Sequence, residues 1–155
     1  MSIMNWINKW RLAKQINDVR ASNGLNSLTR DRSLDNVAWQ HAMYMANNNR
    51  LGYDGFENRA AIIRWQSKRS DRKCVGENCG KHTGSSLDAN VIRATMDGWM
   101  KSDSHRNAIM NPVYNKTGIA GVVEQGHVYV VQVFAGEGVK ARRLPAVSAT
   151  PAFSE

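Results

Sequence analysis

Apolar residues recur at helical intervals through the first third of the chain. Intervals of three and four place side chains on one helix face, and the first set comprises Trp6, Trp10, Leu12, Ala13, Ile16 and Val19 or Arg20. Asn23-Gly24 indicates the end of this helix, because glycine readily takes the left-handed conformation found there. A second helix, which Ser33 could cap, is predicted to end by Gly52. Its apolar face comprises Leu34, Val37, Ala38, His41, Ala42 and Met45.

The middle of the chain has a weaker pattern. Residues 60–65 predict a short helix, and Gly76, Gly80 and Gly84 then indicate a loop-rich segment. A third helix is predicted to start near Ser86, with Asp88 in its first turn. The side of this helix expected to be buried comprises Val91, Thr95, Gly98 and Trp99, flanked by Ile92 and Met96. A short helical turn over residues 105–110 is stopped by Pro112.

The last third of the chain contains two β-rich runs. Residues 117–123 and 127–134 flank Glu124-Gln125-Gly126, and this arrangement predicts a β-hairpin. Because helices precede and separate the strands, the expected class is α+β, as a layered α/β/α arrangement. Residues 137–155 hold two prolines and many small residues, so we expect a tail outside the core.

The composition narrows the class of protein. A length of 155 residues suits one ordinary domain. No run of about 18 apolar residues is present, so we expect no transmembrane segment, and two cysteines cannot make a disulfide framework. The 21 basic residues exceed the 13 acidic ones by eight. This excess favours an acidic partner, which could be nucleic acid, anionic glycan, lipid headgroups or another protein.

An ordered set of motifs runs through the chain. The motifs are Ile16-Asn17-x-x-Arg20, Gly24-Leu25-x-x-Leu28, Leu34-x-x-x-Ala38, Gly76-Glu77-Asn78, Trp99-Met100-x-Ser102-x-x-His105-Arg106-Asn107-x-Ile109-Met110-Asn111-Pro112, Gly118-Ile119-Ala120 and Tyr129-Val130-Val131-Gln132-Val133-Phe134. Together they resemble the CAP superfamily of cysteine-rich secretory proteins, antigen 5 and pathogenesis-related 1 proteins, in its compact bacterial SCP-like branch. The resemblance covers residues 12–136 and implies a three-layer α/β/α sandwich with a central antiparallel sheet. Residues 1–11 would then be an N-terminal helical extension, and residues 137–155 a basic tail rich in Pro, Ala and Ser.

The resemblance also implies a cleft with two histidines and two acidic residues, which often hold a divalent metal such as zinc. By position in the motifs, Glu77 is one acid and His105 is one histidine. Tyr53 stands where the second histidine is expected, and Glu57 is the best candidate for the second acid. A phenol titrates near ~10 and is a poor zinc ligand at neutral pH. We therefore expect no metal or other cofactor, with a weak site of His105 and Glu77 as the alternative.

The serines beside His105, and His41 in the second helix, are expected to have structural roles and not catalytic or metal-binding ones. Ser102 and Ser104 flank His105, but residues two or three apart in one turn seldom align a hydroxyl with its base. Ser102 is therefore expected to cap the turn that begins near His105. His41 lies on the apolar face of the second helix, where a hydrogen-bonded core histidine is favoured over a metal ligand.

Cys74 and Cys79 bracket the Gly-Glu-Asn motif. In a strand, five steps of ~3.3 Å would separate them by about 17 Å, whereas a disulfide needs Cα atoms within ~7 Å. They could pair only if the segment loops back, and together with His82 they form a weak candidate for a zinc site. Free buried thiols are the favoured interpretation.

Basic residues form a candidate docking patch for a protein partner or an anionic surface. The patch comprises Arg64, Lys68, Arg69, Arg72, Lys73, Arg142 and Arg143. Nucleic acid is not expected, because the chain has no zinc finger, RNA-binding aromatic signature or helix-turn-helix. Residues 1–10 lack the apolar run and cleavage site of a secretory signal. The resembled family is usually extracellular, but no signal peptide is recognised here. The location is therefore left undecided among a virion, export by a non-classical route and the cytoplasm.

Three hypotheses for function follow. The leading one is a non-catalytic binding module whose cleft, lined by Tyr53, Glu57, Glu77 and His105, holds a small polar ligand or a partner segment. The second is a protease-like hydrolase that uses His105 and Glu77 as an acid–base pair. The third is a structural component of a larger assembly, such as a phage virion, and it is motivated by the missing signal sequence, the basic surface and the tail.

Overall fold

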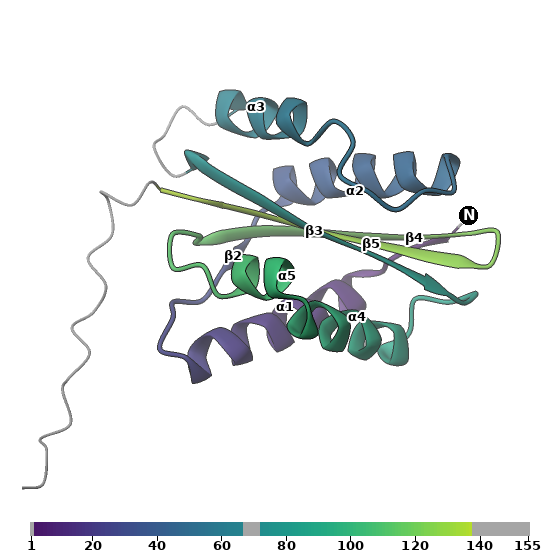
Figure 1. Cartoon of the computed structure of the whole chain (residues 1–155), viewed down its shortest axis with the longest axis horizontal. Helices are drawn as coiled ribbons and strands as arrows, with labels where there is room; N and C mark the ends of the chain where they lie inside the picture. The colour runs from purple at the N-terminus through teal and green to yellow at the C-terminus, as the bar shows by residue number, and fades with distance from the viewer. Residues whose placement is uncertain (1, 67–71, 138–155) are drawn as a thin grey trace, which may run out of the picture.

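Two layers of helices enclose a five-stranded sheet (Figure 1), which confirms the expected α+β class and α/β/α layering. The structure is a computed structural model and describes residues 2–66 and 72–137. The helices are α1 (Trp6–Ser22), α2 (Arg32–Asn47), α3 (Phe56–Gln66), α4 (Ala89–Lys101) and α5 (Asp103–Ile109). The strands are β1 (Ser2–Ile3), β2 (Thr29–Arg30), β3 (Cys74–Thr83), β4 (Lys116–Glu124) and β5 (His127–Gly136).

The sheet has the order β1-β4-β5-β3, and β3 lies at its edge. These four strands pair antiparallel, whereas the two-residue β2 pairs parallel with the start of β4. Helices α2 and α3 cover one face of the sheet, and α1, α4 and α5 cover the other (Figure 1). Each face therefore has its own hydrophobic core, and β5 contributes alternate side chains to both, such as Val130 to one and Val131 to the other.

The predicted hairpin is confirmed, with β4 and β5 paired from Lys116↔Ala135 to Glu124↔His127. Gln125 and Gly126 both have positive φ, at 48° and 75°. Two such residues form the tight turn whose twist matches that of the flanking strands. The apolar face expected for the second helix is also confirmed, since all six of its residues are buried in α2.

The prediction of a loop-rich segment around Gly76 and Gly80 is wrong. These residues lie inside β3, which pairs with β5 along its whole length. Gly76 serves close packing instead of a turn, because a Cβ there would lie 2.3 Å from the Tyr114 hydroxyl, whereas a Cβ on Gly80 would come no closer than 3.4 Å to a neighbour. Glycine content was therefore a misleading signal of irregular structure.

The buried face of α1 differs from the expected one. Trp6 and Trp10 are 72% and 52% exposed, whereas Leu12 and Ile16 are fully buried. At 3.6 residues per turn, Trp10 is rotated by about 120° from Ile16. The first two turns of α1 thus present two tryptophans on its outer side. The helix itself runs without a break across residues 11 and 12, and Met4, which precedes it, is buried in the core.

Helix boundaries elsewhere follow capping side chains. Asp31, and not Ser33, caps α2, because its carboxylate accepts hydrogen bonds from the backbone N–H groups of Ser33 and Leu34. Asp88 caps α4 in the same way, so this helix begins at Ala89. The buried side of α4 comprises Ile92, Thr95, Met96 and Trp99. Val91 is partly buried and packs against the core as expected, whereas Gly98 is exposed, so its expected burial is wrong. Helix α3 starts four residues earlier than residue 60, at Phe56.

Arg20 fixes the connections at one end of the sheet. Its side chain is fully buried, and its guanidinium donates hydrogen bonds to the carbonyls of Asn26, Ile109, Asn111 and Tyr114 at 2.8–3.1 Å. Bonds to several backbone carbonyls offset the cost of burying a charge. No helix among residues 2–66 and 72–137 is long and apolar enough to cross a membrane.

Candidate functional site

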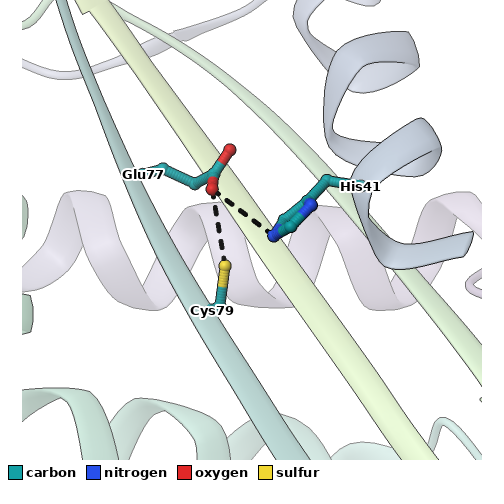
Figure 2. A group of neighbouring side chains, drawn as sticks. All are labelled: His41, Glu77 and Cys79. Atoms are coloured by element: carbon teal, nitrogen blue, oxygen red, sulfur yellow. Dashed lines mark hydrogen bonds and ion pairs between the residues drawn. The ribbon is translucent and has the colours of Figure 1, made fainter. Parts of the chain in front are cut away.

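The motif residues meet at the β3 edge of the sheet. Side chains alternate across a strand, so Glu77 and Cys79 face the α2–α3 layer together. His41 of α2 points toward the same Glu77 oxygen as Cys79 (Figure 2). On the other side of the strand, His105 of α5 lies near Trp99 of α4, with their rings stacked at 6.4 Å between centroids.

Glu77 is held by Arg59 of α3 in a two-pronged salt bridge. Arg59 Nε lies 2.9 Å from Glu77 Oε2, and Arg59 Nη2 lies 2.6 Å from Glu77 Oε1. The Glu77 side chain is 1% exposed and that of Arg59 is 13% exposed. A parallel pair of charge-assisted bonds is the strongest geometry for this contact. The buried carboxylate is therefore neutralised within the chain.

His41 completes the buried side of the site. Its Nε2 lies 2.7 Å from the Gly52 carbonyl, which can only accept, so Nε2 carries the proton. The same nitrogen is 3.6 Å from Glu77 Oε1, and Nδ1 has no hydrogen-bond partner among the described residues. Burial lowers the pKa of His41, and the neighbouring Arg59 charge acts in the same direction although Glu77 opposes it. The interpretation as a hydrogen-bonded core histidine fits these contacts.

Both cysteines are free. The Cys79 thiol is buried and donates to Glu77 Oε1 at 3.6 Å. Burial, together with the Glu77 charge, raises the pKa of this thiol, so it stays protonated. Cys74 and His82 lie on the opposite face of β3, and His82 Nε2 instead contacts Thr95 Oγ1 at 2.8 Å. The alternation of β3 therefore separates the three residues of the weak zinc candidate Cys74, Cys79 and His82.

A chain of hydrogen bonds forms the other half of the site. The Tyr53 hydroxyl lies 2.8 Å from His105 Nε2, and His105 Nδ1 lies 2.7 Å from Ser102 Oγ. We assign the neutral Nδ1–H tautomer, in which Tyr53 donates to Nε2 and Nδ1 donates to Ser102. Burial lowers the pKa of His105 and raises the pKa of Tyr53 to about 12, so both groups are neutral at pH 7.

Ser102 has a different role from the expected one. It occupies the N-cap position of α5 but makes no capping hydrogen bond with its side chain. Its hydroxyl orients His105 instead. Because His105 uses its other nitrogen for Tyr53, the serine contacts a base that is already engaged on both sides.

The outward backbone groups of the β3 edge are covered at Cys79. The N–H of Cys79 donates to the Tyr53 hydroxyl at 3.4 Å, and its carbonyl accepts from the Trp99 indole at 3.1 Å. Asn78 adds a side-chain bond to the carbonyl of His105 at 3.0 Å. Tyr53 thus reaches from the α2–α3 loop across the strand edge to α5, while 44% of its surface is exposed.

Only some of the residues predicted to line the cleft are in contact with one another. Tyr53 and His105 are in contact, whereas the described hydrogen bonds and ion pairs include none between Glu77 and His105. Glu57 is exposed in the first turn of α3, and the contacts described for the site do not involve it.

In the predicted basic patch, Arg72 pairs with Asp31, and Arg64 donates to the Lys73 carbonyl. Lys68, Arg69, Arg142 and Arg143 lie outside the described residues.

One set of potential metal ligands converges in the part of the chain that the structure describes. His41, Glu77 and Cys79 place one donor atom each within 4.8 Å of one another (Figure 2). The set does not fit a resident cation, for two reasons. The guanidinium of Arg59 already occupies both oxygens of Glu77, and His41 Nε2 carries a proton that it donates to Gly52. A metal would have to displace both contacts and ionise a thiol whose pKa is raised.

A pocket opens beside this buried cluster. Its volume is about 310 Å³, and it is lined by Gln40, His41, Tyr44, Asp54, Gly55 and Arg59. The pocket lies on the α2–α3 side, whereas the hydroxyl and imidazole groups of Tyr53 and His105 lie at the strand edge.

Sequence reasoning missed Arg59 and the contact of His41 with Glu77. A buried glutamate needs a compensating cation or proton, so the Gly-Glu-Asn motif could have prompted a search for an arginine. It gives no means of choosing Arg59 among the arginines of the chain. The contact of His41 depends on how α2 packs across β4 and β5, beside β3, which no local spacing encodes.

The family model described as CAP, the cysteine-rich secretory protein family, matches residues 13–134. The chain belongs to this family. A search of curated proteins found no match. The family assignment confirms the resemblance seen in the motifs and agrees with the α/β/α layering described above.

Solved structures show the same fold at low identity. An outer surface protein from Borrelia burgdorferi has a TM-score of 0.71 at 18% identity, over 88% of this chain and 98% of that one. An extracellular protein containing an SCP domain from Bacillus anthracis has a TM-score of 0.65 at 23% identity, over 84% of this chain and 40% of that one. A cysteine-rich secretory protein from Staphylococcus aureus has a TM-score of 0.63 at 21% identity, over 86% of this chain and 40% of that one.

Proposed function

We propose that this CAP domain is a non-catalytic binding module whose site is the hydroxyl and imidazole surface at the β3 edge. The observation that carries the proposal is the engagement of both candidate acid–base groups by structural partners: Arg59 holds Glu77, and Tyr53 and Ser102 hold His105. An acid–base pair needs its two members within hydrogen-bond reach of one substrate. Glu77 is buried on the α2–α3 side of β3, away from His105, and this position does not favour the hydrolase alternative.

The ligand that suits this surface is small, polar and uncharged. Tyr53, His105 and Ser102 carry no charge at pH 7, so a ligand here would exchange hydrogen bonds with hydroxyl and imidazole groups that now bond to one another. A partner segment that adds to the sheet as a strand is disfavoured, because Tyr53 and Trp99 already cover the outward backbone groups of Cys79. Ligands rich in hydroxyl or amide groups, such as short glycans and peptides, match the remaining chemistry.

The site is further proposed to work without a metal. Tyrosine in place of a histidine removes one nitrogen donor, and the contact with Arg59 removes the Glu77 carboxylate from the set. Both changes lower the number of ligands that could converge on an ion.

The test is a titration of the isotope-labelled full chain with a panel of short glycans and di- and tripeptides, followed by NMR. We expect shifts at Tyr53, Ser102 and His105 with a member of the panel, and loss of these shifts in Tyr53→Phe and His105→Ala. Tyr44→Phe, in the neighbouring pocket, is the matched control and should bind like the wild type. The same panel is assayed for turnover: hydrolysis that His105→Ala abolishes would establish the enzyme alternative, and absence of binding across the panel would contradict the proposal.

A further inference from the structure

The exposed start of α1 carries an unusual set of large apolar side chains. Trp6 is 72% exposed, Trp10 52% and Ile7 41%. Trp6 and Trp10 are one helical turn apart, and Ile7 lies three residues before Trp10, so these three share one side of α1. Several large apolar side chains gathered on one surface mark an interaction site, whereas single ones are ordinary.

Cationic side chains follow these residues along the same side of the helix. Arg11 lies four residues after Ile7, and Lys14 lies four residues after Trp10; both are exposed. Lys14 forms only a surface pair with Asp18, whose side chains are 54% and 64% exposed. Of the three basic residues among the first 17, Lys9 is largely buried and pairs with Asp35, so Arg11 and Lys14 supply the exposed positive charge. The outer side of α1 is thus apolar in its first turns and positive in the next.

We propose that the start of α1 docks on the surface of a membrane that contains anionic lipid. Tryptophan prefers the boundary between headgroups and acyl chains, because its ring is apolar and its indole N–H can bond to water or headgroups. Arg11 and Lys14 then lie level with the phosphates, and the net charge of +8 attracts the whole domain to a negative surface. This combination is that of a helix that lies on a membrane.

A second copy of the chain is a less suitable occupant. A stable protein interface takes roughly 20–30 residues from each partner, and the apolar set on α1 comprises three residues, Trp6, Ile7 and Trp10, bordered by positive charge. Two such surfaces facing each other would also place Arg11 and Lys14 of both copies close together. A lipid surface of opposite charge satisfies the apolar and the basic parts at once.

The test is co-sedimentation of the full chain with vesicles of phosphatidylcholine containing phosphatidylglycerol, and with vesicles of phosphatidylcholine alone. We expect binding to the anionic vesicles that falls with added salt, and at least a tenfold weaker binding for Trp6→Ala/Trp10→Ala, from the apolar area withdrawn from water. Trp65→Ala is the matched control, since Trp65 is 84% exposed on α3 in the opposite helix layer. It should bind like the wild type.

Two further measurements keep the outcomes separate. Thermal unfolding of Trp6→Ala/Trp10→Ala should match the wild type, because both side chains are exposed, and Arg11→Gln/Lys14→Gln should lose the preference for anionic vesicles while keeping its fold. Equal binding to neutral vesicles would overturn the role of charge. Absence of vesicle binding would overturn the proposal. If the wild type were also a dimer in analytical ultracentrifugation and Trp6→Ala/Trp10→Ala a monomer, the occupant of this surface would be a second copy of the chain.

Discussion

The two sides of β3 solve the burial of polar groups in opposite ways. On the α2–α3 side, Glu77 is buried and its charge is matched by Arg59, with His41 and Cys79 packed around it. On the α5 side, Tyr53 and His105 stay neutral, are partly exposed and satisfy each other by hydrogen bonds. The first arrangement is closed and its disruption leaves a bare charge, whereas the second can exchange a partner with water or a ligand. We therefore expect stability to depend on the α2–α3 side, and the proposed ligand to bind on the other side.

The largest expected effect is on the buried side. Arg59→Met leaves the Glu77 carboxylate buried without its cation, so the free energy of unfolding should fall by about 3–5 kcal/mol. Denaturant unfolding monitored by circular dichroism measures it. Arg50→Met is the control, because Arg50 pairs with Asp54 at an exposed position and should cost about 0–1 kcal/mol. Arg59→Met/Glu77→Gln should recover part of the loss, and equal costs for Arg59 and Arg50 would remove the distinction between the two sides.

A histidine at position 53 should change the open side from a hydrogen-bonding surface into a metal site. Tyr53→His places a second imidazole opposite His105, and zinc present at 100 times its Kd would then stabilise the variant by about 2.7 kcal/mol. The wild type should show no change in Tm with zinc chloride or with a chelator. Differential scanning calorimetry of both proteins checks this, and a zinc-dependent rise in the wild type would contradict metal-independent binding.

The pH dependence of stability should come from the buried histidine. The pKa of His41 is lowered from 6.5 by burial, so the unfolded chain takes up its proton first as the pH falls. Stability is therefore full above about pH 6.5 and decreases below it, and each 1 kcal/mol lost lowers Tm by roughly 2–4 °C. His41→Gln should flatten the decrease in Tm between pH 7 and pH 5. His82 and His105, whose pKa values are also lowered by burial, contribute the part that remains.

The smallest effect on stability is expected at Tyr53. Tyr53→Phe removes hydrogen bonds at an exposed side chain, so the free energy of unfolding should change by about 1 kcal/mol or less. The NMR shifts caused by the bound ligand should nevertheless disappear. A loss of stability as large as that of Arg59→Met would show that the open side also carries the fold.

Elements with strong local signals could be predicted from the sequence. The period of α2 and the glycine turn of the β4–β5 hairpin depend on residues close together in the chain, and both are confirmed. β3 could not be predicted, because the Gly76 within it is explained only by the close approach of Tyr114 from a distant segment. The exposure of Trp6 and Trp10 could not be predicted either. A helical period shows which residues share a face, but not which face meets the core.

The motifs could predict which residues belong to the candidate site, but not which contacts those residues make. The motif string named Glu77 and His105, and the structure places Tyr53 beside His105. The bridge from Arg59 to Glu77 joins α3 to β3 across 18 positions, and the bond from Ser102 to His105 depends on the bend between α4 and α5. Such geometry is set by the packing of whole elements, so spacing in the sequence does not contain it.

The side chains bonded to the Cys79 backbone also leave fewer groups free at the sheet edge. An exposed strand edge offers unpaired N–H and C=O groups on which another molecule can add a strand, and continued addition builds a fibril. One edge of this sheet is formed by β1 and β2, which have two residues each, and the other is β3, where Tyr53 and Trp99 bond to the backbone groups of Cys79. The side chain proposed to meet a ligand therefore also limits how the protein can join copies of itself edge to edge.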